Sequence, residues 1–381
     1  MTAVRWTRVL AWSAVAAAGV LLSLGWLTTS FKAGMADPVW PTEPWYLAVN
    51  GRVWREPNRA FLLEHTHRAA GFVVGVLTAL MCGAAWLTDR RAGRRWFGFV
   101  ATVLLVAAYG LFHREMGAAW EMRKVGGGVS VWPANSGLLT ALAAGLLGLA
   151  AASSTGRLAG LRRLASLALV AVMVQGLLGG YRVYLDQLAG MELAAVHGTF
   201  GQVAFCLLLT VATFARPLGA ELPAADRTRL GVGSLALLGM VFVQLVWGVL
   251  VRHGGSAAAQ QLHMLTAFVV TGVTVWLAVR LLNTPRLRGK GVHLLGIVGV
   301  QVTLGVQAWM GKFTATGPQA AVPPMLRDVT VEWALVRSLH AAVGAALLAS
   351  AVLLVLRVWR RAARPEPVEA MAGPSVALAM A

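Results

Sequence analysis

Four histidines stand at corresponding positions in long apolar stretches, each one to two turns inside the start of a predicted helix. They are His67, His197, His263 and His340. Ionisable side chains are costly inside a membrane and mark functional sites there. The four helices run in the same direction in the topology described below, so the imidazoles are expected at one depth. Because imidazole is an axial ligand of haem iron, the pattern predicts two haem sites that share these four ligands.

A small residue follows each histidine by four positions and therefore lies on the same face of the helix. These residues are Gly71, Gly201, Ala267 and Gly344. A flat macrocycle held by an imidazole must lie close to the backbone beside it, and a small residue leaves that room. The alternative is close helix–helix packing, for which small residues at this spacing are common in membranes. Their presence beside all four histidines favours haem binding.

Three of the histidines are preceded by a predicted helix that carries a glutamine four residues before a glycine. The pairs are Gln175 and Gly179, Gln244 and Gly248, and Gln301 and Gly305. The repeated unit is a helix hairpin with glutamine on one arm and histidine on the other. This repeat predicts two similar halves around a pseudo-two-fold axis. We interpret the glutamines as interhelical hydrogen-bonding groups, with a direct role in the sites as the alternative.

Glu64 precedes His67 by three residues and faces the same way. A carboxylate at this depth is costly unless it is hydrogen-bonded, protonated or catalytic. Arg68 either compensates its charge or pairs with a haem propionate, and a simple ion pair at the helix mouth is the alternative to catalysis. Because the other three histidines lack such a glutamate, the two sites are predicted to differ in their chemistry.

The remaining histidines are not expected to bind iron. His65 lies about 200° around its helix from His67 and cannot share a metal with it. His113 and His253 are expected at loop boundaries in contact with solvent, and His293 at the opposite mouth of its helix.

The elements that position these residues are membrane spans. Of the 381 residues 58% are hydrophobic and only 13% are charged, and several apolar runs are long enough to cross a bilayer. The sequence therefore predicts an all-α polytopic membrane protein. Ten helices are expected, at about 9–29, 61–87, 97–113, 134–152, 164–184, 193–214, 229–251, 259–281, 291–311 and 334–357.

The net charge of +18 comes from arginines clustered in short connections between the apolar runs. Most of the lysines and arginines fall on the side that holds both termini, so the positive-inside rule predicts that both termini are cytoplasmic. No basic face of a folded domain remains, which argues against nucleic-acid binding. The two cysteines, Cys82 and Cys206, lie inside apolar runs, so neither a structural disulfide nor a zinc site is expected.

These residues together resemble the haem A synthase family. The resemblance rests on Glu64-x-x-His67-Arg68, the three later histidines, the Gln-x-x-x-Gly arms, the segment 250–253 that ends in Arg252 and His253, and the segment 33–42. It extends over about 9–356, except for the predicted helices within 97–152. Some family members carry a cysteine pair in an outer loop, which this chain lacks.

The resemblance implies two four-helix bundles and a role for each. Haem O, the substrate, would bind between His67 and His197, and a permanent haem b between His263 and His340. Glu64 would be the catalytic or proton-handling carboxylate in the oxidation of the haem O C8 methyl to a formyl group. The product would supply a terminal oxidase in the inner membrane of a bacterium. Haem O synthase and a membrane electron acceptor are the implied partners, beside the lipid bilayer.

The chain is accordingly expected to divide into two halves. The N-terminal half, 1–215, contains Glu64, His67 and His197 together with an inserted helix pair at about 97–152. The C-terminal half, 216–364, contains His263 and His340. Residues 365–381, rich in alanine, methionine and proline, are predicted to form a disordered tail.

Two other functions fit parts of the pattern. A di-haem b-type electron-transfer protein would use the four histidines, but it has little need of a carboxylate such as Glu64 beside one haem alone. A histidine-lined transporter would spread its titratable residues through the bilayer, whereas these gather at one level.

Overall fold

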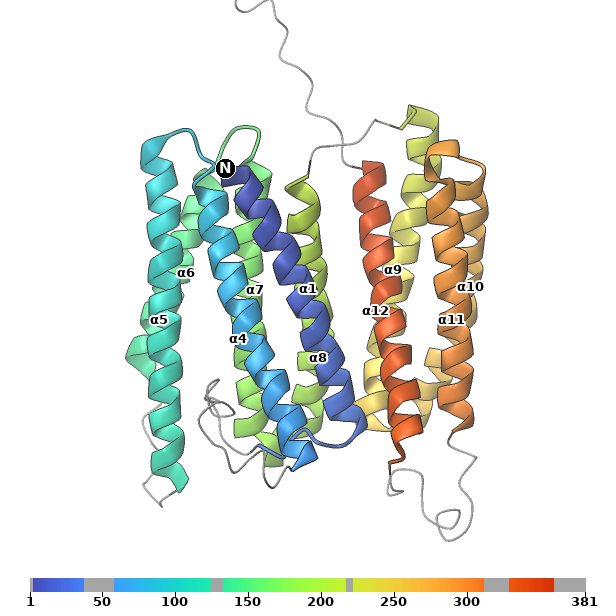
Figure 1. Cartoon of the computed structure of the whole chain (residues 1–381), viewed down its shortest axis with the longest axis horizontal. Coiled ribbons are helices and arrows are strands. Elements are labelled where there is room, and N and C mark those ends of the chain that lie inside the picture. The colour runs from blue at the N-terminus through green and yellow to red at the C-terminus, as the bar shows by residue number, and fades with distance from the viewer. Residues whose placement is uncertain (1–2, 38–57, 125–132, 217–221, 312–328, 360–381) are drawn as a thin grey trace, which may run out of the picture.

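The protein is all-α throughout the residues that the structure, a computed structural model, describes: 3–37, 58–124, 133–216, 222–311 and 329–359. Ten of the helices in these segments are long and apolar enough to cross a membrane (Figure 1). The predicted class, an all-α polytopic membrane protein, is confirmed. The predicted tail at 365–381 lies outside the described residues.

The ten long helices run side by side, and one short 3-10 helix, η1, joins two of them (Figure 1). Their bounds are α1 Ala3–Ser30, α4 Arg59–Trp86, α5 Ala92–Lys124, α6 Ala134–Ser153, α7 Ala159–Tyr184, α8 Asp186–Phe214, α9 Ala224–Gly254, α10 Ala257–Leu282, η1 Pro285–Leu287, α11 Arg288–Met310 and α12 Val331–Trp359.

The helices form two four-helix bundles with one inserted pair, as predicted. In the first bundle α1 packs on α4, α4 on α7, α7 on α8, and α8 on α1. In the second, α9, α10, α11 and α12 close in the same manner, and α1 and α8 of the first bundle contact α12 and α9 of the second. We call the end at which α4, α8, α10 and α12 begin the histidine side, and the end at which α1 begins the arginine-rich side.

The surfaces of the bundles carry large apolar side chains, while small residues fill much of the first core. Ala11 and Ala14 of α1 are completely buried against α4 and α8, whereas Val232 and Phe268 are 69% and 75% exposed. Lipid tails are as apolar as these side chains, so their exposure in a bilayer carries no hydrophobic penalty. The burial pattern is therefore that of a membrane protein.

Helices α5 and α6 pack on each other and stand beside the first bundle, α5 against α4 and α6 against α7 (Figure 1). The predicted end of α5 near residue 113 was wrong, because the helix continues to Lys124. Polar residues that follow the apolar run contact neighbouring side chains. The ring of His113 packs on that of Tyr109, with centroids 4.5 Å apart, and Ser136 of α6 donates a hydrogen bond to Glu115.

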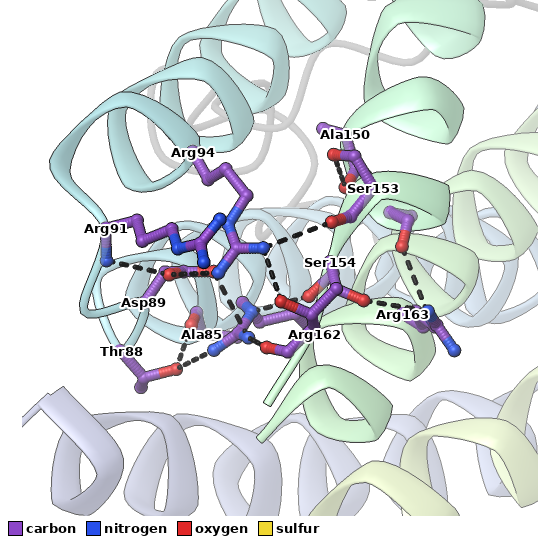
Figure 2. Close-up of polar contacts among 12 residues, drawn as sticks. Ala85, Thr88, Asp89, Arg91, Arg94, Ala150, Ser153, Ser154, Arg162 and Arg163 are labelled. Atoms are coloured by element: carbon purple, nitrogen blue, oxygen red, sulfur yellow. Dashed lines mark hydrogen bonds and ion pairs between the residues drawn. The ribbon is translucent and has the colours of Figure 1, made fainter. Parts of the chain in front are cut away.

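A buried ion cluster fastens this pair to the first bundle on the arginine-rich side, and Figure 2 shows its arginines converging on Asp89. Nη2 of Arg162 lies 3.1 Å from Oδ2 of Asp89, and Nη2 of Arg94 lies 3.4 Å from Oδ1. Arg162 also donates to Oγ of Ser154, while Arg163 donates to the carbonyl of the same serine. The α4–α5 connection, the end of α6 and the start of α7 are thus tied together.

We expect Arg162→Met to destabilise the protein by about 3 kcal/mol or more, because removing one partner of a buried pair leaves the other charge uncompensated. Both Arg162 and Asp89 are 3% exposed, so solvent cannot take over the lost contact. The measurement is the thermal unfolding midpoint in detergent. Arg157→Met, at an exposed arginine two residues before α7, is the matched control. Equal midpoints for the two variants would contradict the structural role of the cluster.

Candidate functional site

The four histidines lie within roughly the first three turns of their helices. His67 is in α4, His197 in α8, His263 in α10 and His340 in α12. All four helices begin at the same end of the molecule (Figure 1), and all four side chains are half-buried. The predicted common direction of these helices is confirmed.

Each imidazole ring packs directly against a glycine of the preceding helix in its hairpin. A Cβ atom added to these glycines would lie only 2.9–3.1 Å from the Cε1 atom of the ring. The pairs are Gly25 with His67, Gly179 with His197, Gly248 with His263, and Gly305 with His340. Real Cβ atoms are scarcely found at such distances, so any larger residue would displace the ring.

The first of these hairpins, α1 with α4, escaped the sequence analysis because it has no glutamine. Leu21 and Gly25 of α1 have the same four-residue spacing as the Gln–Gly pairs. The Nδ1 atom of His67 lies 3.1 Å from the carbonyl oxygen of Leu21, which accepts its hydrogen bond. A search for any residue four before a glycine would have found this hairpin, and the repeat therefore occurs four times.

The carbonyl of the glutamine plays the same part in the other hairpins. Nδ1 of His263 lies 3.1 Å from the carbonyl oxygen of Gln244. The two remaining histidines interact with the backbone of their own glutamines, His197 with Gln175 and His340 with Gln301. Because a carbonyl can only accept, the proton of His263 is assigned to Nδ1, as it is in His67. Nε2 of these rings then keeps the lone pair that a metal needs.

The histidines lie near each other two by two, one pair in each bundle. The ring centroids of His263 and His340 are 6.2 Å apart, with the ring planes at 82°. His67 and His197 lie close enough to interact electrostatically across the first bundle. Two imidazoles on one metal have ligating nitrogens roughly 4 Å apart, from bonds of about 2 Å, and the depth of the rings separates their centroids further. The second pair fits that requirement.

The glutamine side chains reach the same histidines. Nε2 of Gln175 donates to the carbonyl of His197 over 3.0 Å, and Nε2 of Gln244 to that of His263 over 2.8 Å. The interhelical hydrogen bonds predicted for the glutamines are confirmed. Their amide nitrogens also lie 3.4–3.5 Å from Nε2 of the rings of His197, His263 and His340. The glutamines are therefore direct neighbours of the predicted ligand atoms.

The glycines four residues after the histidines differ in what they face. A Cβ atom at Gly201 or Gly344 would lie 3.1 or 3.2 Å from the amide nitrogen of Gln175 or Gln301. A Cβ atom at Gly71 would meet no atom within 4 Å. The space beside Gly71 on α4 is therefore more open than the space beside Gly201 or Gly344.

Glu64 is buried in an ion-paired network at the histidine side. Its Oε1 accepts from Nη2 of Arg68 over 2.6 Å, and its Oε2 accepts from the backbone N–H of Asp37 over 2.7 Å. Oδ2 of Asp37 lies 3.0 Å from Nδ1 of His65. The ion pair considered as an alternative for Glu64 is present. The Asp37–His65 contact was not predicted, because two short segments meeting in space have no periodic pattern in the sequence.

Two of the remaining histidines are more buried than the sequence analysis predicted. His253 lies at the end of α9, as expected for a loop boundary, but it is half-buried there. Its Nε2 lies 3.8 Å from the Cβ position of Gly198, next to His197. His113 is likewise half-buried inside α5. His293 is exposed, as expected at a helix mouth, and bonds to Ser350.

No group of three or more histidines, cysteines, aspartates or glutamates that could hold a metal ion occurs among the described residues. A tetrahedral zinc site needs at least three protein ligands, so the histidine pairs do not suit it. Two imidazoles suffice when a macrocycle supplies the other ligands of the metal. The donor set therefore fits a haem better than a free metal ion.

No protein-family model, no curated protein and no solved structure matches this chain.

We expect Gly248→Leu to lower the unfolding midpoint, because the ring of His263 occupies the space the side chain would need. Overpacking of this kind costs about 1–3 kcal/mol. The matched control is Gly239→Leu on the same helix, where an added Cβ meets no atom within 4 Å. Both variants gain the same helix propensity, so the difference between them isolates the clash. A midpoint for Gly248→Leu equal to that of the control would show that the ring does not pack there.

Proposed function

We propose that this protein is a membrane enzyme that oxidises the C8 methyl group of haem O to a formyl group and so makes haem A. The observation that supports this most is the pairing of four histidines, two in each bundle, with a buried carboxylate beside one pair only. The resemblance of the same residues to the haem A synthase family suggests which haem each pair would bind and which reaction would follow.

The two pairs would have different ligands. In the first bundle His67 and His197 would hold haem O as substrate, and the open flank beside Gly71 leaves room for a macrocycle to enter. In the second bundle His263 and His340 would hold haem b, and their 6.2 Å separation suits a shared iron. Haem b at that pair would supply one-electron transfer. The backbone carbonyls would keep each ring turned with Nε2 towards the ligand.

Glu64 is the residue we assign to proton handling. Converting a methyl to a formyl group adds an oxygen atom, taken from water or dioxygen, and releases protons and electrons. The electrons would pass to the membrane electron acceptor, and a positioned carboxylate can accept the protons. Glu64 lies one turn from His67 and forms a 2.6 Å ion pair with Arg68. Arg68 would then act through Glu64 rather than bind a propionate, since its guanidinium group already contacts Glu64 and Asp37.

A di-haem b-type electron-transfer protein is the second candidate, and the near equivalence of the four hairpins is the observation that favours it. A pure electron carrier would need two similar haem sites and nothing else. The buried Glu64 network beside one pair and the open flank at Gly71 are differences that it would not require. We therefore prefer the enzyme.

The topology indicates how the protein would be oriented in its membrane. The start of α1 and the end of α12 lie on the arginine-rich side (Figure 1). By the positive-inside rule, we place both termini in the cytoplasm of a bacterium and the protein in its inner membrane. Haem O synthase and a membrane electron acceptor are the partners that this activity would require, and cytochrome oxidase assembly would consume the product.

Haem identification tests the proposal directly. The full chain is overexpressed in cells that make haem O, the membranes are extracted, and the haems are separated and identified by mass. We expect haem O to be converted to hydroxylated and formyl products, which cells carrying the empty vector do not form. Haem B alone on the purified protein would support the electron carrier, and no haem at all would exclude both functions.

Glu64→Gln should retain bound haem and lose conversion, because the amide keeps the shape of the side chain but cannot accept a proton. Loss of one general acid–base group lowers rates by roughly 10²–10⁴-fold. Haem content is measured by absorption and conversion by mass. Glu332→Gln, at an exposed glutamate in the first turn of α12, is the control. Conversion by Glu64→Gln at the control rate would rule out the assigned role.

A further inference from the structure

Two arginines lie one turn to the histidine side of the His263–His340 pair. On α9, Arg252 follows Gln244 and Gly248 in steps of four residues and therefore shares their face. On α12, Arg337 precedes His340 by three residues, again on the same face. Electrostatic interactions link Arg252 with Arg337 and with His340, so the two helices bring these groups together.

Arg252 is held firmly, although not by an acid. Its Nη2 donates to the carbonyl of Trp26 and to Oγ of Ser30 in α1, each over 2.6 Å. Its Nε is buried and has no hydrogen-bond partner. The guanidinium group of Arg337 lies over the ring of Trp333, 4.8 Å from its centroid. Both guanidinium groups are therefore oriented by neutral partners.

Among the residues that the structure describes, no carboxylate compensates the positive charge here. Within the described segments, every ion pair of the structure lies elsewhere, and none includes Arg252 or Arg337. Two like charges in a medium of low dielectric constant repel each other strongly, and buried charges are stable only when they are paired. The arrangement therefore calls for an anion from outside the chain.

The first bundle differs at the equivalent position. Glu64 precedes His67 by three residues, as Arg337 precedes His340, so the corresponding positions carry opposite charges. The cation beside Glu64 is Arg68, which is already bonded to that carboxylate and lies 3.7 Å from Asp37. A further arginine, Arg182 at the end of α7, interacts electrostatically with His67 and His197, so the first pair also has a cation near it.

We propose that Arg252 and Arg337 form a carboxylate-binding site that anchors the propionates of a tetrapyrrole held by His263 and His340. Guanidinium groups bind carboxylates through charge-assisted, often bidentate hydrogen bonds. A ligand with two carboxylates would neutralise both arginines and so be held tightly. The His263–His340 pair would therefore hold a resident cofactor. Arg68, already bound to Glu64, would give a ligand between His67 and His197 no such anchor. This inference rests on the proposed function, which it deepens.

The test uses the full chain with His67→Ala and His197→Ala, so that only the second pair binds haem. The haem-free protein is titrated with haemin and with haemin dimethyl ester, whose propionates are blocked, and the Soret band is followed. We expect haemin to bind at least roughly tenfold more tightly than the ester, since charged hydrogen bonds are lost in the ester. Arg337→Gln and Arg252→Gln should each reduce that preference towards one.

Arg114→Gln, at an exposed arginine of α5, is the control and should keep the preference. Arg252 also bonds to α1, so an unfolded Arg252→Gln variant leaves the test to Arg337→Gln. Arg337 makes no hydrogen bond within the described part of the chain, so its replacement leaves the helix contacts intact. An unchanged preference in Arg337→Gln would overturn the proposal. If neither haemin nor its ester binds, the proposed function is wrong. If both bind and Arg337→Gln keeps the preference for haemin, only the propionate site is wrong.

An anionic lipid headgroup presents the same chemistry as a propionate, so the titration is repeated in nanodiscs. Phosphatidylcholine is compared with phosphatidylglycerol as the only lipid. We expect the preference for haemin over its ester to be the same in both. A preference that disappears in phosphatidylglycerol would assign the two arginines to a lipid phosphate and overturn the propionate site.

Discussion

A polar ring inside a bilayer must find a partner for its N–H group, because lipid offers none. In each hairpin a glycine lets the imidazole approach the neighbouring helix. In two of them the carbonyl four residues before that glycine accepts a hydrogen bond from Nδ1, from His67 at Leu21 and from His263 at Gln244. These two rings are thereby fixed with Nε2 turned from the backbone carbonyl, which is the orientation that the proposed ligand role requires.

Repetition of this contact explains the architecture, and departures from it explain the difference between the bundles. Leu21 replaces glutamine in the first hairpin, and the space beside Gly71 is open there. Glu64 and Arg337 occupy equivalent positions with opposite charges. One scaffold used twice can therefore provide two sites of different chemistry, because function depends on the few side chains around each site rather than on the fold.

The features that the sequence predicted are those with a periodic pattern. The apolar runs predicted the spans, the inserted pair and the four histidine-bearing helices, and the Gln–Gly spacing predicted the hairpins. The missed features depend on contacts between distant segments. Asp37 and His65 meet only in three dimensions, while His113 could be taken for a helix end until its packing on Tyr109 was seen. Leu21 was missed because the search required a side-chain amide, whereas the structure uses its backbone.

The proposed haem sites require that the histidines act in pairs within each bundle. A set of double variants measures this pairing most directly. Haem bound per purified protein is determined for alanine variants of His67, His197, His263 and His340, singly and in pairs. The account predicts that each single variant loses one site, that a pair from the same bundle loses no more than either single, and that a pair from different bundles loses both. Loss of both sites from a same-bundle pair, or of only one from a cross-bundle pair, would contradict it.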